Sequence, residues 1–117
     1  MNDNQFGFER LQVYQAAREA LLLVLQHKSQ FKGLPGEIAS QLERAAVSTV
    51  ALIAEAAGRQ GRADQKNRFG MARAEANEAA AMIELAAMYS VFSVEMHGRI
   101  RGLYLSTVRM LSALMSR

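Results

Sequence analysis

The feature of this sequence that most constrains its fold is a set of long helix-forming segments separated by glycine. Most glycines fall in three clusters, at residues 33–36, 58–61 and 98–102, and the only proline, Pro35, lies in the first cluster. Between the clusters the chain is rich in Ala, Leu, Glu, Gln, Arg and Met, which favour helices. No long stretch alternates apolar and polar residues with the period of a strand. We therefore expect an all-α protein.

Apolar residues recur along these segments at steps of three and four, which is the period of an amphipathic helix. Pro35 suits the first turn of a helix, and Asp64 and Ser93 suit N-cap positions. The pattern predicts four helices, over residues 8–29, 35–57, 64–90 and 94–115. The expected core positions are Val13, Tyr14, Ala17, Leu21 and Val24 in the first helix; Phe69, Ala72, Ala76, Ala79, Ile83 and Ala86 in the third; and Met96, Ile100, Leu103, Thr107, Met110 and Leu114 in the fourth.

Helices of this length, each roughly 33 Å long, pack well when short loops make neighbours antiparallel. The predicted fold is an antiparallel up-down-up-down four-helix bundle. A chain of 117 residues supports one hydrophobic core, so a single domain is expected over residues 1–117.

The residues that usually carry chemistry are scarce. The chain has no cysteine, which excludes disulfides, thiolate metal sites and cysteine nucleophiles. Its two histidines, His27 and His97, lie far apart in the sequence, and no Glu-x-x-His motif or phosphate-binding glycine loop occurs. No catalytic residue, metal or cofactor is expected, and an enzyme is the third interpretation after two binding functions.

The expected location is the cytoplasm. The first residues lack the basic and apolar regions of a secretion signal. The longest apolar run, from Ala20 to Leu25, is too short to span a bilayer.

Several segments together resemble a known family. They are residues 8–17 (FERLQVYQAA), 41–48 (QLERAAVS), 53–55 with 58–59, and 68–73, followed by Glu78. In this order they are similar to the four-helix-bundle proteins encoded in intervening sequences of bacterial 23S ribosomal RNA genes, a family that includes the accessory protein of diversity-generating retroelements. The chain departs from the family's Asn-Ile-Ala-Glu-Gly run at Leu52 and Ala56.

The resemblance implies a homo-oligomeric ring, often a pentamer, with a basic surface suited to RNA or DNA. It implies no enzymatic activity. A role that rests on the family's Asn does not carry over to Leu52.

One end of the predicted bundle concentrates positive charge. The start of the first helix, the turn between the second and third helices, and the end of the fourth helix meet there, and we call this end the basic pole. Arginine and lysine at this end favour contacts with phosphates, although charge at helix ends also serves solubility alone. The cations of the basic pole are Arg10, Arg59, Arg62, Lys66, Arg68, Arg109 and Arg117.

The predicted helices also carry more apolar surface than one bundle needs. Leu22, Leu23 and Leu25 lie beside the main apolar face of the first helix, and the faces of the second and fourth helices are wide. Exposed apolar surface favours self-association, although wide seams between neighbouring helices explain the same pattern. The alternative function is a protein–protein adaptor with no nucleic-acid role.

A polar stripe on the second helix contains Arg44, Ser48 and Glu55. These side chains are expected to form a structural network, in which Glu55 pairs with Arg59 four residues later.

Overall fold

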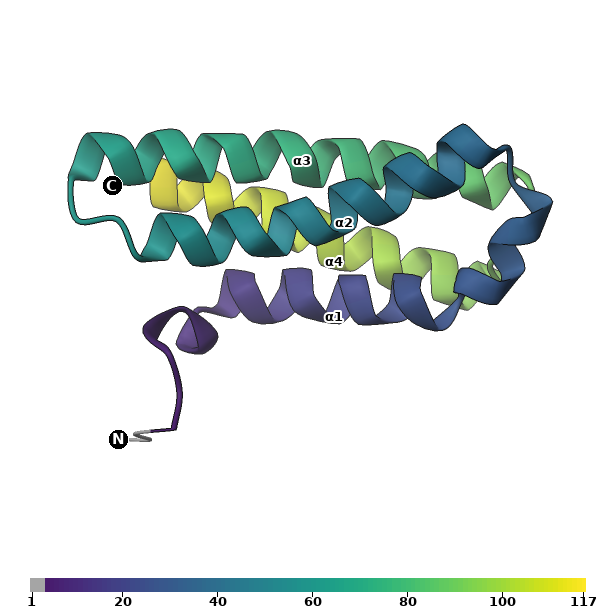
Figure 1. Ribbon diagram of the computed structural model, residues 1–117, viewed down its shortest axis with the longest axis horizontal. Helices are drawn as coiled ribbons and strands as arrows, with labels where there is room; N and C mark the ends of the chain where they lie inside the picture. The colour runs from purple at the N-terminus through teal and green to yellow at the C-terminus, as the bar shows by residue number, and fades with distance from the viewer. Residues whose placement is uncertain (1–3) are drawn as a thin grey trace.

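A computed structural model describes residues 4–117 as four long α-helices and two short 3-10 helices (Figure 1). No strand occurs in this part of the chain, which confirms the all-α class. The elements are η1 (Gly7–Arg10), α1 (Gln12–Gln26), η2 (Lys28–Gly33), α2 (Gly36–Ala57), α3 (Arg62–Met88) and α4 (Val94–Met115).

Each long helix packs against two neighbours. Helices α1 and α3 both contact α2 and α4, so the four helices form a closed bundle in sequence order. Figure 1 shows that successive helices run in opposite directions, as the predicted up-down-up-down bundle requires. Element η1, the α2–α3 turn and the C-terminal end of α4 lie at one end, which is the basic pole.

The core of α3 confirms the sequence pattern. All six predicted positions of this helix, from Phe69 to Ala86, are buried. Four of them are alanines, whose small side chains let neighbouring helix backbones approach closely. The confirmed positions are Phe69, Ala72, Ala76, Ala79, Ile83 and Ala86.

The predicted first helix is wrong at both ends. The chain is extended at Leu11 (φ −72°, ψ 129°), which separates η1 from α1 and lets the Leu11 side chain pack against the core around Phe69. Helix α1 ends at Gln26, where His27 Nδ1 lies 2.8 Å from the Leu23 carbonyl oxygen. The predicted span of 8–29 therefore contains two helical elements and the start of η2.

Two helix starts can be compared with the predicted caps. Helix α3 begins at Arg62 after Gly61, so Asp64 lies in the first turn, where its charge favours the helix dipole, and is not the N-cap. The Ser93 prediction is confirmed, because Ser93 Oγ accepts a hydrogen bond from the Met96 backbone N–H at 3.1 Å.

The inward face of α4 is rotated from its predicted position. The buried residues are Ile100, Tyr104, Thr107 and Leu111. Of these, only Ile100 and Thr107 are among the expected core positions, and Tyr104 and Leu111 are not. Because α4 contacts both α1 and α3, its buried arc points between these two neighbours. The expected core residues Met96, Leu103, Met110 and Leu114 are only partly buried at the edges of that arc.

Tyr104 carries an unsatisfied hydroxyl into the core. Its side chain is 1% exposed, and its Oη is buried without a hydrogen-bond partner among the described residues. A buried polar group without a partner costs free energy. We expect Tyr104→Phe to raise the free energy of unfolding by about 1 kcal/mol in urea denaturation at neutral pH. A destabilised variant would mean that the hydroxyl makes a favourable interaction in solution.

Burial also raises the pKa of Tyr104 above its usual range. The unfolded chain releases this proton near the ordinary pKa of about 10, whereas the folded chain keeps it. The free energy of unfolding of the wild-type protein should therefore fall as pH rises above about 10. In Tyr104→Phe the free energy of unfolding should fall less over the same pH range.

Candidate nucleic-acid interface

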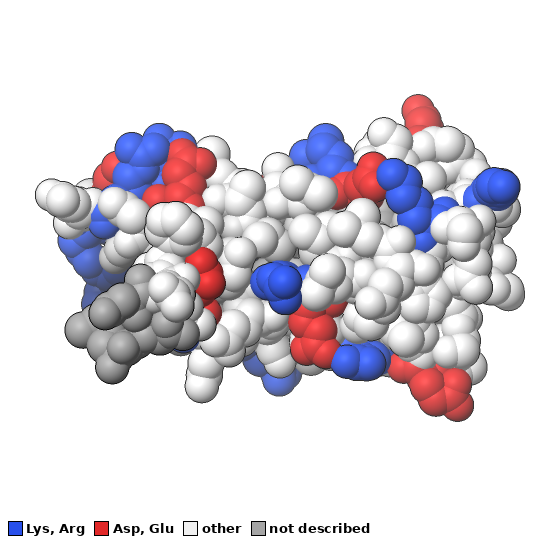
Figure 2. All heavy atoms as spheres, turned by 60° about the horizontal axis from the view of Figure 1, so that its bottom comes forward, with Lys and Arg blue, Asp and Glu red and all other residues white. Residues whose placement is uncertain are grey.

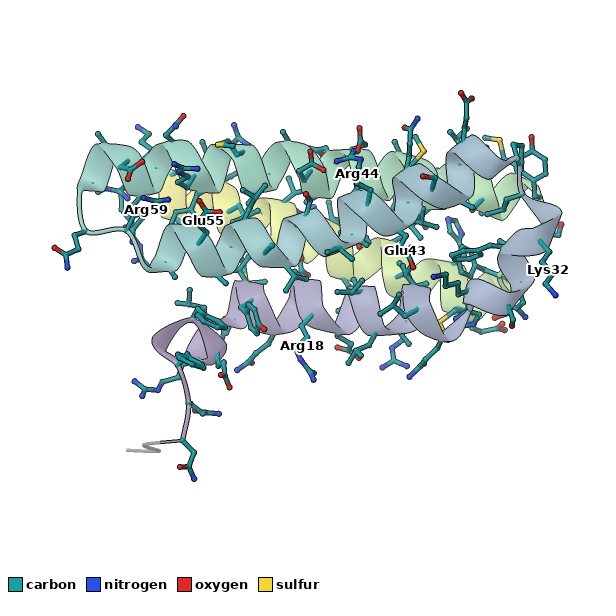
Figure 3. The ribbon with its side chains drawn as sticks, viewed as in Figure 1. Arg18, Lys32, Glu43, Arg44, Glu55 and Arg59 are labelled. Atoms are coloured by element: carbon teal, nitrogen blue, oxygen red, sulfur yellow. The ribbon has the colours of Figure 1, made fainter. Side chains whose placement is uncertain are left out.

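The α2–α3 turn holds a compact cluster of two arginines and two carboxylates. Glu55 Oε1 lies 2.9 Å from Arg59 Nη2 and 3.1 Å from Arg68 Nη1. Asp64 lies 3.8 Å from Arg59 Nε and 3.6 Å from Arg68 Nε. Figure 3 shows the Arg59 and Glu55 side chains together at this end of α2. The cluster balances two positive charges with two negative ones, so Arg59 and Arg68 contribute little free charge to the basic pole.

A second group of cations lies on the side of α3 that faces α4. Arg62 Nη2 donates to the Leu114 carbonyl oxygen at 3.1 Å and also to the Arg117 carbonyl. Arg73 Nη1 donates to Ser112 Oγ at 3.0 Å. Lys66 follows Arg62 by four residues, which places it on the same side of the helix. None of these contacts involves an Asp or Glu side chain.

Helix α4 extends this group. Arg109 precedes Ser112 by three residues and therefore lies on the same side of α4. No acidic residue follows Glu95 in the sequence. Within residues 4–117 no Asp or Glu side chain pairs with any cation of this group. We call the group the α3–α4 basic strip; its members are Arg62, Lys66, Arg73, Arg109 and Arg117.

The six predicted nucleic-acid contacts therefore divide into two sets. Arg62, Lys66, Arg109 and Arg117 lie in the α3–α4 basic strip, whereas Arg59 and Arg68 lie in the balanced cluster. Sequence reasoning missed Arg73, which follows Lys66 by seven residues, or two helical turns.

Arg10 lies near the end of the strip. It lines a pocket of about 300 Å³ between α1 and α4, together with Arg117. Elsewhere the charges are mixed: on the face shown in Figure 2, Lys and Arg alternate with Asp and Glu along the bundle. Asp3, which the sequence also places near the basic pole, lies outside the described residues.

The polar stripe of α2 does not form one network. Arg44 pairs across the helix interface with Glu75, at 3.0 Å, and with Glu78. Glu55 belongs to the cluster at the α2–α3 turn, where its predicted pairing with Arg59 is found. Ser48 is part-buried and makes no hydrogen bond through its side chain within residues 4–117. The ion pairs run mainly between helices because this stripe of α2 faces carboxylates and arginines on α3.

The two histidines have ordinary partners near the opposite end. His27 contacts the Leu23 carbonyl, and His97 Nε2 lies 3.0 Å from Glu84 Oε1. In the part of the chain that the structure describes, no three His, Asp or Glu side chains are placed to hold a metal ion. None of the helices described is both long enough and apolar enough to cross a membrane.

The apolar surface also differs from expectation. Leu22 and Leu25 are exposed on α1, but Leu23 is buried because it packs into the core with Val24. The sequence-based prediction overlooked the outward side of α3, where apolar residues recur at steps of three and four. Glu78 lies in the same row, and its carboxylate is paired with Arg44. We call this row the α3 outer stripe; its apolar members are Met71, Ala74, Ala81, Leu85 and Met88.

The chain is similar to a known protein family and to a known structure. Comparison with curated proteins gives no match. The chain is similar to a crystal structure of a protein with unknown function from the S23 ribosomal protein family of Bacteroides thetaiotaomicron VPI-5482. The TM-score is 0.80 at 22% sequence identity, over 90% of this chain and 99% of that chain, which supports the same fold. The profile of the 23S rRNA-intervening sequence proteins matches residues 9–113, and neither description names an enzymatic activity. The chain belongs to the 23S rRNA-intervening sequence protein family, as the resemblance of its segments predicted.

Proposed function

We propose that this protein is a non-enzymatic, self-associating helical bundle that binds RNA or DNA through the α3–α4 basic strip. The observation that carries the proposal is that no Asp or Glu side chain within residues 4–117 pairs with any of the five cations of the strip. Phosphate contacts supply most non-specific affinity for nucleic acid, and arginine suits phosphate oxygens.

The proposed binding surface is the α3–α4 basic strip and not the whole basic pole. Arg59 and Arg68 hold the α2–α3 turn through Glu55 and Asp64, so their role in the proposal is structural. Arg62 donates to main-chain oxygens at the end of α4 and not to an Asp or Glu side chain. Its guanidinium is therefore held in place next to Lys66, and a fixed donor loses less entropy when it binds a phosphate.

The α3 outer stripe supports self-association. Leu85 is 37% exposed and Met88 is 76% exposed. Their row, with steps of three and four over 71–88, has the spacing of a helix–helix seam. Homo-oligomers are the usual result of such surfaces, and the resemblance to the family favours a ring, often a pentamer. In a ring the basic strip would be repeated once per subunit.

The second candidate is a protein–protein adaptor. The same α3 outer stripe favours it, since exposed methionines adapt to many partners. The salt dependence of nucleic-acid affinity distinguishes the two candidate functions, because binding through phosphates weakens steeply as the salt concentration rises.

Fluorescence anisotropy with a short, labelled, mixed-sequence RNA at low salt tests the proposal. Binding at micromolar protein is expected. The same assay is repeated with single-stranded DNA of the same length. If the wild-type protein binds neither RNA nor DNA, the proposed function is contradicted and the adaptor is the better explanation.

A further inference from the structure

A cavity opens at the basic pole, between η1 and the ends of α2, α3 and α4. Its volume is about 730 Å³, within the size range of small-ligand sites. Its wall joins apolar residues of the chain start and the core to two members of the α3–α4 basic strip. The residues that matter for its chemistry are Phe6, Leu11, Phe69, Gln65, Arg62 and Arg117.

An exposed aromatic ring stands in this wall. Phe6 is 70% exposed, and its ring lies parallel to that of Phe8, with centroids 5.5 Å apart and an angle of 4° between the planes. Phe8 in turn packs against Tyr14 at 5.0 Å. The Phe6 backbone N–H donates to Glu9 Oε1 at 3.3 Å. These contacts fix the Phe6 ring from one side, and its high exposure leaves surface for another flat ring.

The polar groups of the cavity suit a nucleotide. Gln65 Nε2 donates weakly to the carbonyl oxygens of Ala56 and Arg59, at 3.4 and 3.5 Å. Its Oε1 accepts no hydrogen bond from the described residues. Arg62 and Arg117 bring positive charge to the rim from the neighbouring strip. An apolar side chain from a second copy would bury these charges without a partner, which is costly.

We propose that this cavity binds one unpaired base of a single-stranded nucleic acid, stacked on Phe6, while the adjoining phosphates contact the α3–α4 basic strip. The inference rests on the proposed nucleic-acid function and adds a preference for single strands. Stacking on an aromatic ring accepts every base, because each base has a π-face. The site therefore recognises an unpaired base without reading its identity.

Tryptophan fluorescence gives a direct test, since the chain contains no tryptophan. In Phe6→Trp, oligothymidylate should quench the indole emission, whereas an abasic strand with the same number of phosphates should not. In Phe6→Ala, the affinity for oligothymidylate should fall at least about fivefold, with the affinity for the abasic strand unchanged. Phe6 is exposed, so neither substitution threatens the fold.

Three other outcomes would overturn the inference, and they can be told apart. If Phe6→Ala binds oligothymidylate as well as wild type while Lys66→Ala weakens both strands, the base site is wrong and the proposed function stands. If neither strand binds the wild-type protein, the proposed function fails as well. If Phe6→Ala changes the molar mass in light scattering, a second copy occupies the cavity.

Discussion

The double variant Lys66→Ala/Arg109→Ala is expected to bind single-stranded RNA at least about tenfold more weakly than wild type at low salt. Both side chains are exposed, belong to the α3–α4 basic strip and have no carboxylate partner in the described structure. Their loss removes two phosphate contacts without breaking an ion pair. Fluorescence anisotropy, with circular dichroism to confirm folding, measures the effect.

A matched control removes the same charge elsewhere. Arg18 and Lys32 are also exposed, and no carboxylate pairs with either in residues 4–117. Figure 3 shows Arg18 on the outer side of α1 and Lys32 near the end opposite the basic pole. Arg18→Ala/Lys32→Ala should keep an affinity close to that of wild type. Equal losses in the two double variants would mean that net charge, and not the strip, drives binding.

The substitution Leu85→Lys is expected to dissociate the proposed homo-oligomer. In the proposed interface this substitution would bury an unpaired charge among apolar residues of the α3 outer stripe. The dissociation constant should rise at least about a hundredfold. Light scattering at micromolar concentration should then change from a multiple of 12.9 kDa in wild type to 12.9 kDa in Leu85→Lys.

Leu22 on α1 provides the control for this variant. It is 39% exposed, close to the 37% of Leu85, and it belongs to the flank that the sequence indicated for self-association. Leu22→Lys should keep the mass of wild type. If Leu22→Lys dissociates the assembly and Leu85→Lys does not, the interface lies on α1. A wild-type mass of 12.9 kDa would contradict self-association altogether.

The sequence predicted the fold class because each helix repeats its apolar residues strongly. The core of α3 was read correctly, since Phe69 and Ile83 recur with alanines at a regular helical step. The buried face of α4 was harder to predict, because apolar residues cover a wide arc of this helix. Packing against both α1 and α3 decides that Tyr104 and Leu111 lie at the centre of the buried face. The break at Leu11 depends on a tertiary contact with the Phe69 region, which no local pattern encodes.

The candidate site could be predicted only in part. Position along the chain placed Arg59, Arg62 and Arg68 at one end of the bundle, but it could not assign their partners. The contact between Arg68 and Glu55 joins two helices, so it depends on how α2 and α3 pack. Arg73 was missed because it lies two turns below the pole. Phe6 was missed because it precedes the predicted first helix.

The salt dependence of RNA binding by the wild-type protein tests the central claim most directly. If the five cations of one strip contact five phosphates of a single strand, the logarithm of the affinity should fall with the logarithm of salt with a slope of about −3.5. Between about 50 and about 200 mM salt, the affinity should therefore fall roughly a hundredfold. An affinity that stays constant over this range would contradict binding through the α3–α4 basic strip.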